Sequence, residues 1–192
     1  TQRLRDIINK GVKEEDHINS VTTAFNGGWS GVKLYFMLGL PAETMEDVEG
    51  IADLGNKVVS TYMSVPKEKR GKGLSVTIST SSFVPKPFTP FQWEPQDKIE
   101  VLREKQIFLK NKIRSKYIKY NWHDSELSFI ESVFARGDRR VGKALVKAWE
   151  KGCKFDGWGE HFRFESWMQA FEECELDPGF YSNRKRDYSE VF

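Results

Sequence analysis

The sequence predicts an α/β protein, because it contains two units in which an apolar strand runs into a Gly- or Pro-marked loop and then a helix. The first unit begins at residues 32–44 and the second at residues 79–93. A strongly amphipathic helical pattern follows each loop. Repeated strand–loop–helix units build parallel sheets or barrels. Such folds bind ligands at the carboxyl ends of their strands, so the two loops are the first candidates for a site.

The bulk composition allows a sizeable core and excludes few functions. The chain has 192 residues, of which 39% are hydrophobic and 14% aromatic, and its net charge is +2. A charge this close to neutral gives no general attraction for nucleic acid, which leaves only local patches to provide one. No apolar run approaches the ~20 residues of a membrane span, so we expect no membrane partner. Two cysteines form no disulfide framework, and we expect a cytoplasmic location.

The patterns along the chain divide it into two predicted domains, an α/β domain at 1–117 and a helical extension at 118–192. In the first domain we expect strands at 33–38 and 74–83 and helices at 2–9, 13–26, 44–64 and 96–117. Thr44 and Asp47 resemble a capping box at the start of the third helix. In the extension we expect helices at 125–135, 139–151 and 161–174 and an irregular tail. Thr1 already lies in a helical pattern, which we interpret as a cut from a longer protein; processing or an omitted leader is the alternative.

The turn at residues 39–44 has two interpretations. Gly39 lets a ligand approach the backbone closely, and the helix start after it offers free N–H donors. Glu43 at this mouth could accept a hydrogen bond from a ligand. Alternatively, the segment is a plain turn in which Glu43 is stabilised by the helix dipole.

The second loop also leaves two interpretations open. The hydroxyl side chains at residues 79–82 suit either a polar barrel interior or a strand with one solvated face. The proline- and aromatic-rich loop at 85–95 is either a lid over a site or a stiff cap.

Three further features are weighed against ordinary structural roles. His123 and Asp124 resemble a catalytic pair, but a helix N-cap beside a surface histidine is the favoured interpretation. The arginines at 136–140 bind an anion or, as we favour, form ion pairs with Asp138, Glu131 and Glu160. Cys153 and Cys174 have no partner at metal spacing, so we expect structural thiols and no metal site.

The motifs together resemble radical S-adenosylmethionine enzymes. Residues 32–44, with the core Phe-Met-Leu-Gly-Leu-Pro-Ala-Glu-Thr, are similar to the fifth strand and turn of that family, and residues 81–93 are similar to the sixth strand. Residues 1–11 resemble the region after the fourth strand. Residues 134–140 and 153–158 resemble an uncharacterised bacterial branch that usually carries an N-terminal cobalamin-binding-like domain. The resemblance covers essentially the whole chain.

This resemblance implies the C-terminal part of a partial, TIM-like (β/α) barrel followed by a helical extension. The family holds a 4Fe-4S cluster that cleaves S-adenosylmethionine to a 5′-deoxyadenosyl radical, and cobalamin is a further cofactor to consider. The cluster needs three thiolates. This chain lacks the C-x3-C-x2-C motif, which belongs to the first half of the barrel. We therefore expect the missing N-terminal half to be a partner, and the isolated fragment to bind no cofactor and to be inactive.

The resemblance assigns cofactor-binding positions but no catalytic residue. Met37 corresponds to an apolar position that packs on adenine, and Gly39 to a glycine that admits the nucleoside. Ser81 and Val84 correspond to the sixth strand near the adenine. Lys10 corresponds to a basic position that can meet the methionyl carboxylate. Each also has an ordinary structural interpretation, and Glu43 is interpreted as structural.

The rival hypothesis is a binding module for RNA or a partner protein. It would use Arg136, Arg139 and Arg140 with the Trp-rich helices of the extension. Exposed aromatic rings beside arginines would favour it, because stacking needs open faces. Burial of the rings of Trp149, Trp158 and Trp167 would count against it. A third interpretation is a structural lid or interface domain for another subunit.

Overall fold

The computed structural model describes residues 1–190, which form a small parallel sheet and eight helices. Contacts divide the chain into two compact units: Thr1–Ser81 with Arg103–Trp122, and Ser82–Leu102 with the residues from His123 onward. Along residues 1–190 no helix combines the length and apolarity that crossing a bilayer requires. The elements in chain order are α1 (Gln2–Ile7), α2 (Glu14–Asn26), β1 (Gly31–Leu38), α3 (Met45–Ser64), β2 (Ser75–Ser82), α4 (Ile99–Lys112), β3 (Ile118–Trp122), α5 (Ser125–Arg136), α6 (Val141–Glu150), α7 (Phe164–Glu173) and α8 (Pro178–Ser182).

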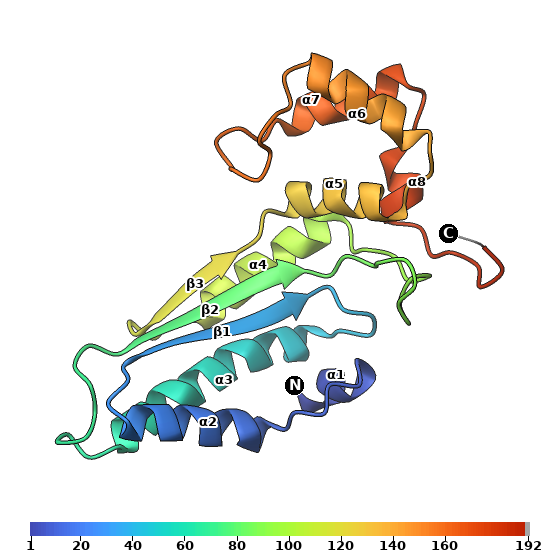
Figure 1. Cartoon of the computed structure of the whole chain (residues 1–192). Helices are drawn as coiled ribbons and strands as arrows, with labels where there is room; N and C mark the ends of the chain where they lie inside the picture. Colours follow the sequence, from blue (N-terminus) through green and yellow to red (C-terminus); the bar gives the residue numbers. More distant parts are fainter. Residues whose placement is uncertain (191–192) are drawn as a thin grey trace. The chain divides into compact units, whose positions relative to one another are not determined.

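The sheet follows the chain order β1-β2-β3, and its arrows point the same way (Figure 1). The register between β2 and β3 pairs Val76 with Ile118 and Thr80 with Trp122. Crossovers between neighbouring parallel strands are almost always right-handed, so this sequential order puts α3 and α4 on one face of the sheet. The first core agrees, because buried side chains of both helices pack with those of the strands. They include Val48, Val58, Val76, Ile78 and Leu109.

Helix α3 begins where the sequence predicts, because a capping box fixes its first turn. The Thr44 hydroxyl accepts a hydrogen bond from the Asp47 N–H, and the Asp47 carboxylate accepts one from the Thr44 N–H at 2.9 Å. Gly55 lets the helix lie directly on β2, since a Cβ there would stand 2.8 Å from the Ile78 Cδ1. On its other side α3 meets α2 through an edge-to-face contact between Phe25 and Tyr62, 5.3 Å between ring centroids.

The second unit is built from α5 to α8 and the segment that leads into α4. Its core joins α5, α6 and α7 through residues such as Val133, Ala148 and Phe171. Gln96 is buried and ties the leading segment to the helices: its amide nitrogen donates to the carbonyls of Phe83 and Ser128, both at 3.1 Å. Its amide oxygen accepts from the Ser182 hydroxyl at 3.0 Å, so this side chain links three parts of the unit.

Most predicted elements are confirmed, and the mixed α/β class is observed with a three-stranded parallel sheet. Two elements differ. The predicted helix 96–117 ends at Lys112, and β3 follows; no Gly or Pro marks that break. The tail predicted to be irregular contains α8, which begins behind the N-cap Asp177 with Pro178 in its first turn.

The compact units also cross the predicted domain limits of 117 and 118. Residues 118–122 belong with the sheet, because β3 pairs with β2. Residues 82–102 belong with the helical unit, because Gln96 and Ile99 are held there. The second unit is therefore assembled from two separate stretches of chain.

The outer edge of β1 generates the first prediction. In the three-stranded order, β1 is an edge strand of eight residues that carries only one charged side chain, Lys33. Long apolar edges pair readily with other strands. We expect this chain to self-associate, so its sedimentation coefficient should rise with concentration. Hydrogen exchange at β1 amides should slow in parallel. A concentration-independent monomer would contradict the prediction.

The Asp47 carboxylate generates the second prediction. Burial opposes its ionisation, but hydrogen bonds from Thr1, from the Thr44 backbone and from Arg3 outweigh burial and hold its pKa well below the usual value. A carboxyl with a lowered folded-state pKa stabilises the fold above its unfolded pKa and loses that contribution as pH falls. Urea unfolding should therefore show stability falling below about pH 4.

Asp47→Asn should flatten that acid limb and lower stability at neutral pH by about 1 kcal/mol, the usual value of an N-terminal cap. Asp53→Asn provides the control, since Asp53 lies on the exposed face of the same helix. An unchanged pH profile in Asp47→Asn would contradict the assignment.

Candidate functional site at the end of β1

The turn after β1 has a conformation that only a few residue types adopt easily. Gly39 has φ of +81° and Ala42 has φ of +63°. The Glu43 N–H donates to the Leu40 carbonyl at 3.0 Å, which closes a turn with Pro41 and Ala42 at its centre. Pro followed by a residue with positive φ is the pattern of a type II turn. Gly39 itself is buried at the strand end, and its positive φ is the feature that favours glycine there.

Glu43 braces this turn from inside. One carboxylate oxygen, Oε1, accepts the Gly39 N–H at 2.9 Å and lies 2.8 Å from the Lys105 ammonium. The Glu43 and Lys105 side chains are only 1% and 11% exposed. The carboxylate is buried and its Oε1 is used twice within the fold, so the structural interpretation of Glu43 fits its contacts better than ligand binding. Sequence reasoning missed Lys105, which lies on α4 with no local motif to mark it.

A second set of contacts holds the outer side of the turn. Arg3 donates to the Ala42 carbonyl at 2.8 Å and pairs with the Asp47 carboxylate. Thr1 donates its hydroxyl to the same carboxylate. Ala42, with its positive φ, is thus held between the start of α1 and the start of α3.

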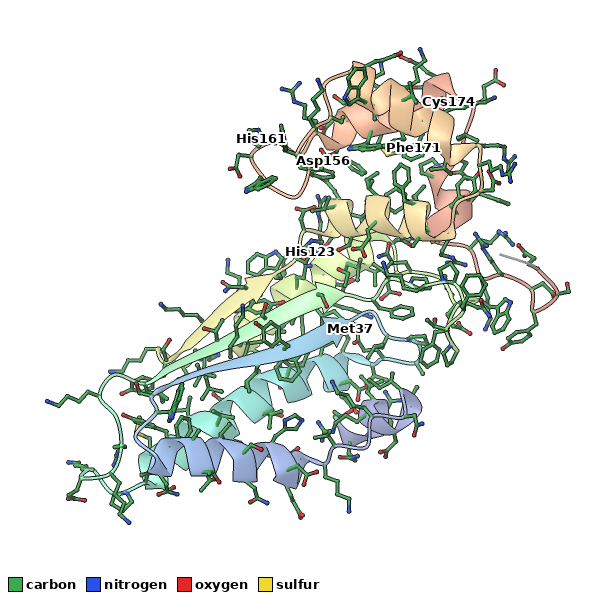
Figure 2. The ribbon with its side chains drawn as sticks, viewed as in Figure 1. Met37, His123, Asp156, His161, Phe171 and Cys174 are labelled. Atoms are coloured by element: carbon green, nitrogen blue, oxygen red, sulfur yellow. The ribbon has the colours of Figure 1, made fainter. Side chains whose placement is uncertain are left out.

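The sheet has one open face, formed by side chains that alternate with the core positions. On β1 these are Lys33, Tyr35 and Met37, all exposed, whereas Leu38 is buried. On β2 the alternation leaves Val76, Ile78 and Thr80 in the core and Ser81 exposed. The Ser81 hydroxyl lies 3.5 Å from the Phe36 carbonyl, which brings it beside β1 near Met37. Figure 2 shows Met37 near the arrowhead of β1.

The hydroxyl pattern predicted for 79–82 therefore divides between two faces. Ser81 belongs to the open face, while Thr80 is buried and its hydroxyl lies 3.0 Å from the Tyr120 hydroxyl. Burial raises the pKa of Tyr120 to about 12, although the hydrogen bond with Thr80 opposes this. Tyr120 therefore stays neutral and serves the core rather than the open face.

The structure unites some of the predicted cofactor positions but not all. Met37, Gly39 and Ser81 share one end of the sheet. Lys10 follows α1 with its backbone N–H bonded to the Arg5 carbonyl at 2.8 Å, and its side chain is exposed. Val84 is half-buried and belongs to the helical unit. Tyr35 and Lys33 extend the open face and were not predicted; their alternation with Leu34 and Phe36 is the signal that could have identified them.

The arginines of the helical unit play different parts. Arg140 pairs with Asp138 at 2.6 Å, as predicted. Arg136 is buried and donates to the Ser182 and Arg184 carbonyls at 2.8 and 3.0 Å. Burial, reinforced by the neighbouring arginines, lowers the pKa of Arg136 to about 10. Arg136 thus binds the tail backbone instead of an acidic side chain. Glu131 pairs with Lys86 at 2.5 Å, not with these arginines.

The remaining features take their ordinary roles. Asp124 caps α5 by accepting the N–H groups of Glu126 and Leu127, and the exposed His123 has its Nδ1 2.8 Å from the Ser128 hydroxyl. Both cysteines are free thiols, and burial raises the pKa of Cys153. Within residues 1–190 no cluster of His, Cys, Asp and Glu could hold a metal ion.

The tryptophans of the helical unit divide between core and surface. Trp167 is buried in the second core, whereas Trp149 and Trp158 are exposed. Burial therefore counts against a binding module only at Trp167, because the rings of Trp149 and Trp158 are exposed.

Comparison with known proteins shows one similarity. The chain is 32% identical over 145 residues to an uncharacterized protein from the archaeon Methanocaldococcus jannaschii. The match covers 76% of this chain and 30% of the relative, so the chain corresponds to less than a third of that protein. No family model matches the chain, and no solved structure matches it.

The Glu43–Lys105 pair generates the third prediction. Lys105→Met leaves a buried carboxylate without its cation, which costs about 3–5 kcal/mol. Lys112→Met is the matched control on the same helix, because Lys112 pairs with Glu49 at 2.7 Å on the surface, where a pair is worth about 0–1 kcal/mol. Adding Glu43→Gln to Lys105→Met should recover much of the loss. Equal effects of the two lysine variants in urea unfolding would disprove the assigned role.

Proposed function

We propose that this chain is the C-terminal part of a radical S-adenosylmethionine enzyme, which is an Fe-S oxidoreductase in chemical class. The observation that carries the proposal is the sheet: neighbouring parallel strands follow the chain order, and α3 and α4 pack on one face only. In a (β/α) barrel the helices cover the outside and the other sheet face lines the interior. The open face with Tyr35, Met37 and Ser81 corresponds to such an interior.

In this proposal the end of the sheet forms the adenine-side wall of the S-adenosylmethionine site. Met37 offers an exposed thioether for packing against the base. Gly39 fixes the backbone at the strand end, where its N–H is held by Glu43. Ser81 offers an exposed hydroxyl. The family resemblance also assigns Lys10 to the methionyl carboxylate and Val84 to the adenine side, although Val84 belongs to the helical unit.

The residues of this chain do not fit the 4Fe-4S cluster. The cluster needs three thiolates, whereas the sequence has two cysteines, and the thiol of Cys153 has a raised pKa. The proposal therefore assigns the cluster ligands, and any cobalamin domain, to a further N-terminal part of a longer polypeptide. That part is the proposed partner, the proposed setting is the cytoplasm, and the chain by itself is inactive.

The fourth prediction tests this with the longer protein. After anaerobic reconstitution it should show a 4Fe-4S absorption spectrum and cleave S-adenosylmethionine reductively to 5′-deoxyadenosine. Absence of both in well-folded protein would reject the proposal.

Variants of this chain's residues sharpen the test. Met37→Ala should raise the Kd for S-adenosylmethionine roughly tenfold, because one apolar side-chain contact is worth about 1–2 kcal/mol. Gly39→Val should weaken binding further and also destabilise the fold, since a φ of +81° strains a β-branched residue and would distort the turn. Lys33→Ala, at the other end of the same strand face, is the control and should leave the Kd unchanged.

A further inference from the structure

The end of α6 and the loop after it expose three large aromatic rings. Trp149, Phe155 and Trp158 are 59%, 68% and 59% exposed. We call these three residues the aromatic surface. They lie within the helical unit and outside the proposed S-adenosylmethionine site. Clustered exposed apolar side chains usually mark a binding surface.

The loop that carries the aromatic surface is held in a fixed conformation. The Trp158 N–H donates to the Phe155 carbonyl at 3.0 Å, and the His161 N–H donates to the Trp158 carbonyl at 2.8 Å. Phe155 has φ of +60°, which is strained for an aromatic residue. Its ring contacts those of Trp158 and His161 at centroid distances of 6.0 and 6.3 Å. Figure 2 shows Asp156 and His161 on this loop. The rings are thus preorganised, and retained strain of this kind is typical of binding sites.

The segment that leads into the aromatic surface is basic, and the loop itself carries charge of both signs. From Arg139 to Lys154 the sequence has six basic residues and one acidic residue, Glu150, and the loop then adds Asp156 and Glu160. The Lys154 ammonium lies 4.7 Å from the centre of the Trp149 ring. Within residues 1–190, no carboxylate pairs with Arg139, Lys143 or Lys154, so these cations are available to an anionic partner.

We propose that the aromatic surface binds single-stranded RNA. Open ring faces stack with unpaired bases, and a cation beside a ring can meet the phosphate that links two bases. Lys154 covers one side of Trp149 and provides that contact. The buried Arg136 takes no part, because its guanidinium is bonded to the tail backbone.

The fifth prediction uses fluorescence anisotropy of a labelled, mixed-sequence single-stranded RNA with the 192-residue chain. Trp149→Ala and Trp158→Ala should each weaken binding roughly tenfold, the usual effect of removing one stacking ring. Trp29→Ala is the matched control, since Trp29 is 68% exposed but lies in the other unit, and it should change nothing. Circular dichroism checks that each variant is folded.

Lys154→Gln should reduce the slope of log affinity against log salt by about 0.7, the value for one phosphate contact on a single strand. Lys67→Gln, an exposed lysine of the first unit, should leave the slope unchanged.

Three results would overturn the proposal: no binding of RNA at low salt, equal losses in Trp29→Ala and Trp149→Ala, or equal affinity for duplex and single strand. If Trp149→Ala instead abolishes concentration-dependent self-association without affecting RNA, the aromatic surface is a protein interface and the proposal is wrong.

Discussion

The contact on which the candidate site depends is the buried Glu43 carboxylate, which holds the Gly39 N–H and the Lys105 ammonium with one oxygen. It joins the end of β1 to α4, the helix that follows β2 in the chain. Removing either charge leaves the other buried and uncompensated. The backbone at the end of β1 is therefore positioned by the packing of α4, so a change at Lys105 affects both the Gly39 turn and the stability of the sheet.

Buried polar side chains that hydrogen-bond the backbone also hold the helical unit together. Gln96 and Arg136 bind backbone carbonyls rather than acidic partners, and Arg186 donates back to the Arg136 carbonyl. Each satisfies carbonyl groups that loops would otherwise bury unpaired. The unit is thus held by an aromatic core and by side chains that replace secondary-structure hydrogen bonds.

Local signals predicted the elements that have local causes. The capping box at Thr44 and Asp47, the Asp124 cap and the helix stop at Gly27 could be predicted from a few neighbouring residues. The strand Ile118–Trp122 could not be predicted in this way. Its pairing with β2 depends on residues about 40 positions earlier, and no turn residue precedes it. Within the site, Met37, Gly39 and Ser81 follow from motif and alternation, whereas Lys105 reaches Glu43 only through the fold.

The division of the chain between its two units limits which fragments of the protein can be expressed as intact units. The backbone passes from one unit to the other at Ser81, at Leu102 within α4, and at Trp122. Neither unit is a continuous stretch, so no simple truncation yields one of them intact. Gln96 can bond the Ser182 hydroxyl only after residues beyond Ser182 have left the ribosome, so the helical unit is completed late in synthesis, whereas all residues of the first unit have been made by Trp122.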